Sequence, residues 1–244
     1  MSGVRLAALY SIAPHKLGLC GPQKKSKTLK LFNYLSGKKI SEKEIKKILQ
    51  DFRGAYFYYK LIAKSNNIFD VFNEKIVRAY WIGNELLEKV GISKLKELIA
   101  KNFKKPKLAK KLPENSKSHH SFHVLIAGPM RKDLLMTEGM KDLCKISWGK
   151  VLKIGDGKLQ IANLIVEYQP LLKEKNWFLG KPIKRRIFCF KRILPKVKVG
   201  DFISFHWDLA LEKLSETDLR NLKKYTELSV QTANFCQNEK KELR

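Results

Sequence analysis

Apolar residues recur at helical spacing through most of the first hundred positions. Ser41 and Glu44 form a capping-box sequence, which is typical of a helix N-terminus. A wider apolar pattern follows Asp70 and continues to Val90, and a further one begins near Ser93. The helix that follows Ser41 has one apolar face, formed by Ile45, Ile48, Leu49 and Phe52. Together these patterns predict an α-helical domain over residues 1–103.

Four consecutive aromatic residues lie inside this region, from Tyr56 to Tyr59. Aromatic side chains beside lysines can stack on nucleic-acid bases. Four neighbours on a helix point in different directions, however, which favours packing in the core. We therefore expect these rings to stabilise the helical domain.

The pattern changes after residue 103. Residues 104–118 carry lysines and prolines with few apolar positions, which predicts a solvated basic connector. His119, His120 and His123 then lead into an apolar run that we interpret as a strand. Because alternate residues of a strand face opposite sides, His120 and His123 would lie on different faces. One or two of these histidines could bind a metal; hydrogen bonding at a strand edge is the alternative.

Short strands are expected from Asp142 onward. Ile146 and Trp148 alternate with polar residues, and Gly155-Asp-Gly157 is a hairpin signal. Further strand-like runs cover residues 159–168, 177–179, 187–190 and 202–206. This spacing of short strands and turns predicts a small β-barrel.

Helices are expected at the end of the chain. A short one follows Asp208 and continues to Leu214, and Ser215 is a cap signal for the last. The whole pattern predicts an α+β fold with an α-helical N-terminal domain, a small OB-like β-barrel and a C-terminal helix. The expected boundaries are 1–103 for the helical domain, 104–118 for the basic connector, 119–208 for the barrel and 209–244 for the C-terminal helical segment.

Composition adds a strong positive charge to this picture. The 244 residues include 50 lysines and arginines against 23 acidic residues, a formal charge of +27. The electric field of a protein with this charge attracts polyanions, and nucleic acid is the usual partner of such a protein. The lysines are spread along the chain, so a compositional bias without function is the alternative. The four cysteines are far apart, as in a protein of the reducing cytoplasm. No segment has the ~18 apolar residues of a membrane span.

The chemical candidates are thiols and imidazoles, because the sequence lacks the motifs of the common nucleotide-binding and hydrolytic enzymes. Cys144 begins the strand region and His206 ends its last strand. The first and last strands of a barrel can lie side by side, so we expect these two residues to converge on one metal ion. His123 is a third candidate ligand. Lys145 could lower the pKa of the Cys144 thiol; the alternative is that Cys144 fills an apolar position of the barrel, as buried cysteines often do. Thiolate with imidazole suits zinc, copper or iron. The sequence leaves the cofactor open, with iron or zinc as the candidates.

A second candidate site lies in a loop near the N-terminus. Cys20 has Gly18 and Gly21 close by, and His15 precedes it. The thiol could be reactive or could bind a metal together with His15. The alternative is a small side chain packed beneath a tight turn.

A basic stretch lies in the last part of the predicted barrel. It interleaves Phe188 and Phe190 with charged residues, which is what an oligonucleotide-binding surface on a small barrel needs. The charged residues are Lys184, Arg185, Arg186, Lys191 and Arg192. Inward phenylalanines with outward charges would give the same alternation without any ligand.

The barrel region also resembles a known family. Cys-x-Ile-x-x-Gly-Lys-Val opens at Cys144, and Val-Gly-Asp-Phe-Ile-x-x-His closes at His206, followed by Ala-x-Glu-x-Leu. These motifs, within residues 142–214, resemble the HypC/HupF family of small β-barrel chaperones for nickel–iron hydrogenase maturation. The resemblance implies a HypC-like barrel that holds an iron fragment carrying cyanide and carbon monoxide through Cys144 and His206. It also implies a protein partner, a metalloenzyme precursor or a maturation factor.

Motifs outside the barrel give a second resemblance. Pro-x-x-Leu-Gly-x-Cys-Gly-Pro at 14–22, Ala-Tyr-Trp-Ile-Gly-Asn at 79–84 and His-His-Ser-Phe-His at 119–123 join the barrel motifs. Together they resemble one prokaryotic family of unknown function that covers nearly the whole chain. The hypotheses are therefore a non-enzymatic metallocentre-assembly chaperone or adaptor, and a basic nucleic-acid-binding protein that uses the barrel face. A cysteine-dependent enzyme around Cys20 or Cys144 has the least support.

Overall fold

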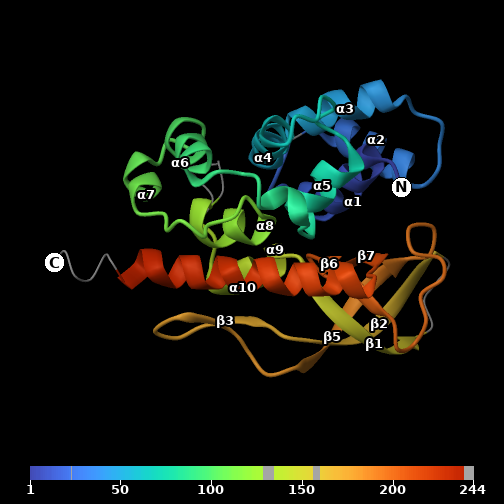
Figure 1. Cartoon of the computed structure of the whole chain (residues 1–244). Helices are drawn as coiled ribbons and strands as arrows, with labels where there is room; N and C mark the ends of the chain where they lie inside the picture. Colours follow the sequence, from blue (N-terminus) through green and yellow to red (C-terminus); the bar gives the residue numbers. More distant parts are fainter. Residues whose placement is uncertain (23, 129–134, 156–159, 239–244) are drawn as a thin grey trace.

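The computed structural model describes residues 1–22, 24–128, 135–155 and 160–238 (Figure 1). Helices form most of the first part, strands follow, and one long helix closes the chain. The helices and helical turns are α1 Gly3–Lys16, α2 Lys25–Leu35, α3 Glu42–Gln50, α4 Arg53–Ser65, α5 Glu74–Trp81, η1 Glu85–Leu87, α6 Ile92–Lys101, α7 Pro106–Lys110, α8 His120–Phe122, η2 His123–Ala127, α9 Glu138–Cys144 and α10 Glu216–Asn238. The strands are β1 Ser147–Gly155, β2 Ile161–Tyr168, β3 Leu171–Lys173, β4 Trp177–Leu179, β5 Ile183–Phe190, β6 Phe202–His206 and β7 Leu209–Lys213.

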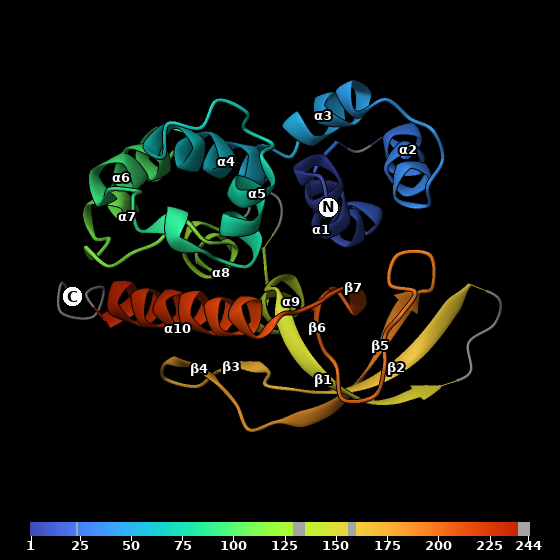
Figure 2. The ribbon, with the colours of Figure 1, turned by 45° about the vertical axis from the view of Figure 1, so that its right-hand side comes forward.

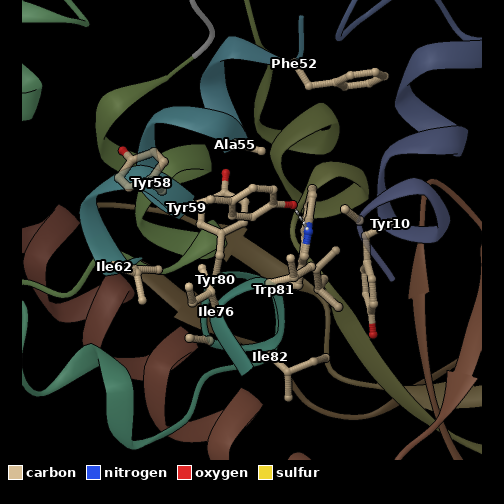
Figure 3. Packing of buried hydrophobic residues seen from close by; sticks show 14 of the residues in the cluster. Tyr10, Phe52, Ala55, Tyr58, Tyr59, Ile62, Ile76, Tyr80, Trp81 and Ile82 are labelled. Atoms are coloured by element: carbon tan, nitrogen blue, oxygen red, sulfur yellow. Dashed lines mark hydrogen bonds between the residues drawn. The ribbon is translucent and has the colours of Figure 1, made fainter. Parts of the chain in front are cut away.

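Buried aromatic rings pack the N-terminal helices together (Figure 3). Tyr58 and Tyr80 stack with ring centroids 5.2 Å apart, and Tyr10 stacks on Trp81 at 5.3 Å. The Trp81 indole N–H donates to the Tyr59 hydroxyl at 2.5 Å. All five side chains are at most 3% exposed. Two of the four consecutive aromatic residues therefore lie in the core, as helical geometry predicts.

Five strands close into a barrel in the order β1-β2-β5-β7-β6. The contact between β5 and β7 is parallel, and the other neighbours are antiparallel. Strand β1 pairs with β6, with Ser147 opposite Phe205, so the beginning of the strand region lies beside its end. Inward side chains such as Val151, Leu164 and Ile187 fill the barrel. Strands β3 and β4 form a separate hairpin.

The helical part and the barrel share one hydrophobic core. Ile146, Trp148 and Leu211 of the strand region belong to the same buried cluster as the N-terminal helices. Tyr10 of α1 adds a polar contact, because its hydroxyl donates to the Glu212 carboxylate of β7 at 2.5 Å. The two halves are therefore fixed relative to one another.

Helix α10 lies between the N-terminal helices and the β3–β4 hairpin (Figures 1 and 2). On one side, Asn234 accepts the backbone N–H of Trp177 at 2.7 Å and donates to its carbonyl at 2.9 Å. On the other side, Tyr225 packs against Gly83, where a Cβ would lie 2.0 Å from the ring and φ is 98°. Glycine is therefore required at the turn after α5.

The segment after His119 is helical, so the expectation of a strand was wrong there. His119 caps α8 by accepting the backbone N–H of Ser121 at 3.2 Å, and the π-helical turn η2 continues to Gly128, where φ is 70°. Short apolar runs do not distinguish buried helix from buried strand. The helical conformation lets this segment contact α10, where the hydroxyls of Ser121 and Thr226 share a hydrogen bond of 3.0 Å.

Residues 209–213 also differ from the expectation, since they form β7 rather than a helix. Four of the five positions are buried, and only Lys213 is exposed. A strand buried on both faces loses the alternation that identifies a strand. In the folded protein this segment pairs with both β5 and β6 and closes the barrel, a long-range contact that the local pattern does not reveal.

Smaller differences lie elsewhere. The pattern from Asp70 to Val90 forms α5 and the short turn η1 instead of one helix, and part of the expected connector forms α7. The hairpin signal after Gly155 falls on residues 156–159, outside the described residues, although β1 and β2 pair antiparallel on either side. In the described part of the chain, no helix has both the length and the apolar character to cross a bilayer.

Candidate metal site

A cavity of about 280 Å³ lies between the N-terminal helices and the barrel. Its described lining includes two thiols, Cys20 and Cys144, and three imidazoles, His120, His123 and His206. They come from the loop after α1, from α8, η2 and α9, and from the end of β6. The fold therefore brings thiols and imidazoles, side chains that can bind a metal, from remote segments into one space.

Three of these residues form a compact group. The ligand atoms of His120, Cys144 and His206 all lie within 4.8 Å of one another. The two histidines are at most 4% exposed, and Cys144 is partly exposed as a residue although its sulfur is buried. The structure thus brings Cys144 and His206 together, as the barrel argument from the sequence expected, and it adds His120.

His206 has a free ligand atom. Its Nδ1 lies 2.9 Å from the Tyr10 carbonyl, an acceptor, so Nδ1 carries the proton. Nε2 is buried and makes no hydrogen bond of standard geometry among the described residues, although the Cys144 carbonyl lies near enough to the ring to affect its pKa. Burial lowers the pKa of His206 to about 4, although the Tyr10 and Cys144 carbonyls oppose that shift. The ring is therefore neutral at pH 7, with a lone pair directed by a backbone acceptor, as in many metal-binding histidines.

A strained turn holds His206 in place. Trp207 and Asp208 connect β6 to β7 in a two-residue hairpin turn, and both have positive φ, 50° and 58°. This conformation usually takes asparagine and glycine, so tryptophan is costly there. The Trp207 N–H donates to the Leu143 carbonyl at 2.9 Å, and Asp208 lies 2.6 Å from Arg185. These contacts fix the turn, and the Trp207 side chain lines the cavity.

Cys144 is the last residue of α9, a helix that begins at the cap residue Thr137. Burial raises the pKa of its thiol to about 12, with a further increase from the nearby Cys20, while the Trp207 side chain acts in the opposite direction. The expected activation by Lys145 is absent, because that ammonium group points to Asp142 at 3.4 Å and to Ser147 at 2.5 Å. Without a metal, Cys144 is a protonated thiol at pH 7.

His120 is held between two polar groups. Its Nδ1 lies 3.1 Å from the Tyr80 hydroxyl, and its Nε2 lies 2.9 Å from the Cys144 carbonyl. Burial and the neighbouring histidines lower its pKa well below the usual range, so the ring is neutral. Because both nitrogens have partners, His120 must release one contact to bind an ion. It would therefore be a weaker or conditional ligand than His206.

The other histidines of this segment lie farther from the group. His123 lines the cavity, with its ring centroid 6.1 Å from that of His120, and its Nδ1 has no hydrogen-bond partner among the described residues. His119 faces the other way and stacks on Tyr225 at 5.8 Å. Helical geometry places residues three apart on one face, so His120 and His123 lie together, whereas a strand would have separated them. The sequence reasoning counted His120 among the possible ligands but chose His123 as the third one, because a strand would have put the two on different faces.

Cys20 lines the same cavity, but His15 does not. The Nδ1 atom of His15 lies 3.1 Å from the Cys20 carbonyl, and its Nε2 lies 3.0 Å from the Thr28 hydroxyl. Both nitrogens of His15 are thus used to hold the loop. Burial raises the pKa of the Cys20 thiol to about 11. His15 therefore positions the loop, and Cys20 is the residue of that pair that reaches the cavity.

The basic residues of the barrel lie away from this cavity. Lys184, Arg186, Lys191 and Arg192 are exposed, and Phe188 beside them is 51% exposed. Arg185 differs, because it pairs with Asp142 at 3.1 Å and with Asp208 at 2.6 Å. It is therefore part of the structure that supports the β6–β7 turn, while its four neighbours face solvent.

Comparison with known proteins identifies a family to which the chain belongs. Residues 1–240 match the model of a family of unknown function, DUF6390, and this match bears out the whole-chain resemblance. No curated protein and no solved structure matches the chain. The matched range includes the helices, the barrel and α10 together. The chain that carries the Cys144–His206 cavity therefore belongs to DUF6390, a family of unknown function.

Proposed function

We propose that this protein binds a transition-metal ion or a metal fragment in the cavity and serves as a non-enzymatic metallocentre-assembly chaperone or adaptor. The observation that carries this proposal is the group of His120, Cys144 and His206, whose ligand atoms lie within 4.8 Å of one another. One thiolate with imidazole nitrogens suits zinc, copper or iron. The free Nε2 of His206 gives such an ion a prepared first ligand.

The protonation states favour binding over catalysis. The raised pKa values of Cys144 and Cys20 keep both thiols protonated at neutral pH, so neither is a ready nucleophile. A metal ion displaces the thiol proton on binding. Among the described residues that line the cavity, the one carboxylate is Asp51, which pairs with Lys27 at 2.6 Å. The cavity thus offers metal ligands but no paired acid and base.

The resemblance of residues 142–214 to the HypC/HupF family supports the assembly role. The motif cysteine of that resemblance corresponds to Cys144 and the motif histidine to His206, the two residues that converge on the cavity. A barrel of five short strands agrees with a HypC-like module. On this proposal the protein receives the metal or its fragment in the reducing cytoplasm. The protein then passes this metal or fragment to a protein partner, which is a metalloenzyme precursor or a maturation factor.

Replacing Cys144 by alanine is expected to remove most of the bound metal. The protein is purified without air, loaded with iron(II) or zinc(II), and its metal content is measured after removal of excess ions. Wild type is expected to retain about one ion per chain. Cys144→Ala is expected to lose at least about 100-fold in affinity, because it loses its strongest soft ligand.

The matched control is Cys189→Ala, which removes a buried thiol from the barrel core outside the cavity. This variant should bind metal as wild type does. Equal metal content in wild type and Cys144→Ala, or no metal in either, would remove the proposed site.

A second function is supported by the exposed cations on β5 and directly after it. Lys184 and Arg186 alternate along β5 with buried or partly buried positions and share the exposed face of Phe188, and Lys191 and Arg192 follow the strand directly. Cations beside an exposed aromatic ring are what a surface for single-stranded nucleic acid requires. Replacing these four residues by alanine is expected to weaken oligonucleotide binding and to reduce its dependence on salt. Fluorescence anisotropy at several salt concentrations measures both. An unchanged affinity would exclude this face, and Arg185 is left intact because it supports the fold.

A further inference from the structure

Sulfur atoms are concentrated at the cavity. Four of the residues that line it contain sulfur, namely Cys20, Met136, Met140 and Cys144. The whole chain has four cysteines and four methionines, so half of them meet at a site lined by 21 described residues. Random placement of eight residues in a chain of 244 would put fewer than one there. The cavity is therefore far richer in sulfur than the rest of the protein.

Helix α9 explains how these groups are aligned. Met140 and Cys144 are four residues apart on α9, so their side chains share one face. Met136 immediately precedes the cap residue Thr137, whose hydroxyl accepts the Met140 N–H at 3.2 Å. The cap fixes the start of the helix, and Met136, Met140 and Cys144 all line the cavity.

The side chains that line the cavity favour a soft ion. Besides the four sulfur-containing residues, the lining includes three imidazoles, those of His120, His123 and His206. The one carboxylate among its described residues is Asp51, which pairs with Lys27 at 2.6 Å. Hard cations prefer oxygen ligands, so this lining suits a soft ion better than a hard one.

We propose that the preferred ion is copper(I), bound by Cys144 and His206, with the Met136 and Met140 thioethers contributing sulfur contacts. This inference rests on the proposed metal-binding function and specifies its metal. Thiolate and thioether ligands select copper(I) over harder ions, and neutral imidazole also suits it. The thioethers are neutral sulfur ligands, so they add soft contacts to the cavity without adding charge.

The test compares copper(I) with zinc(II) in wild type and in the Met136→Leu/Met140→Leu variant. Leucine keeps the volume and apolar character of methionine but lacks sulfur. Affinity for copper(I) is measured without air by competition with bathocuproine disulfonate, and affinity for zinc(II) by competition with a chromophoric chelator. We expect the double variant to lose at least about tenfold in copper(I) affinity and less than about twofold in zinc(II) affinity.

Val124→Ile is the matched control, because it changes an apolar wall of the same cavity without touching sulfur. It should leave both affinities unchanged, and the thermal unfolding midpoint of every variant checks the fold. Equal copper(I) affinity in wild type and the double variant, or tighter binding of zinc(II) than of copper(I), would overturn the copper proposal while the metal site stands. Failure of wild type to bind either ion would remove the metal site itself.

Discussion

Acidifying the metal-free protein from pH 7 to pH 5 is expected to lower its free energy of unfolding by several kcal/mol. The cause is a set of buried neutral histidines. Burial lowers the pKa of His119 to about 3 and those of His123 and His206 to about 4, and it also lowers that of His120. Each ring avoids a proton in the folded state that it would bind in the unfolded chain.

The direction follows from proton linkage. An unfolded histidine has a pKa near 6.5, so at pH 5 the unfolded state binds about one more proton per histidine than the folded state. The contribution of these histidines to the free energy of unfolding is therefore fully present above pH 6.5 and is lost as the pH falls toward 4. Each histidine contributes about 2 kcal/mol of this loss between pH 7 and pH 5. The combined loss from four such histidines is comparable to the whole free energy of unfolding of a typical domain, about 5–15 kcal/mol.

Urea unfolding at pH 7, 6 and 5 measures this loss, and His123→Phe is the matched variant. Phenylalanine keeps the ring that packs against Tyr58 and Phe103 at centroid distances of 5.7 and 5.5 Å, but it cannot bind a proton. The variant should lose about 2 kcal/mol less than wild type between pH 7 and pH 5. A wild-type stability that stays constant down to pH 5 would contradict the burial of these rings.

Replacing Arg78 by methionine is expected to destabilise the protein by about 3–5 kcal/mol. Arg78 lies on α5 and contacts Glu212 of β7 at 3.1 Å and Asp218 of α10 at 3.3 Å. Glu212 is 9% exposed, and it also accepts the Tyr10 hydroxyl. Without the guanidinium group, Glu212 would be a buried carboxylate without its cation, which carries a cost of that size.

Urea unfolding at pH 7 measures this change, with Arg186→Met as the control for loss of an exposed arginine. The control should differ from wild type by no more than about 0.5 kcal/mol. Arg78→Met/Glu212→Gln should regain part of the loss, because the second change removes the unpaired charge. A loss below about 1 kcal/mol for Arg78→Met would mean that this pair does not join the helices to the barrel.

The sequence predicted the classes of structure better than their boundaries. The apolar faces correctly indicated helices in the first hundred residues, and the run of short alternating segments correctly indicated a barrel. The starts of α5 and α6 differ from the expected ones, since Asn73 and Gly91 precede these helices. The largest errors lie where most positions are buried: α8 and η2 after His119, and β7 from Leu209. When side chains on every side of a segment are buried, the periodicity that distinguishes a helix from a strand weakens.

The candidate site could be predicted in part. Cys144 and His206 were placed at the two ends of the strand region, and the pairing of β1 with β6 accounts for their approach. His120 required the helical geometry of α8, and Trp207 required a turn that tryptophan rarely adopts. Met136 and Met140 carry no motif at all. Only the fold identifies them as candidates, because it places four sulfur-containing residues around one cavity.

The X-ray absorption spectrum of the metal-loaded protein, compared with that of Cys144→Ala, tests the central claim most directly. A soft ion held by Cys144 and His206 should show sulfur and imidazole nitrogen among its nearest neighbours, at distances typical of metal–thiolate and metal–imidazole bonds, about 2.3 and 2.0 Å. The thiolate sulfur should disappear from the spectrum of the variant. A first shell of oxygen alone in wild type, or one that the substitution leaves unchanged, would contradict a metal site between the helices and the barrel.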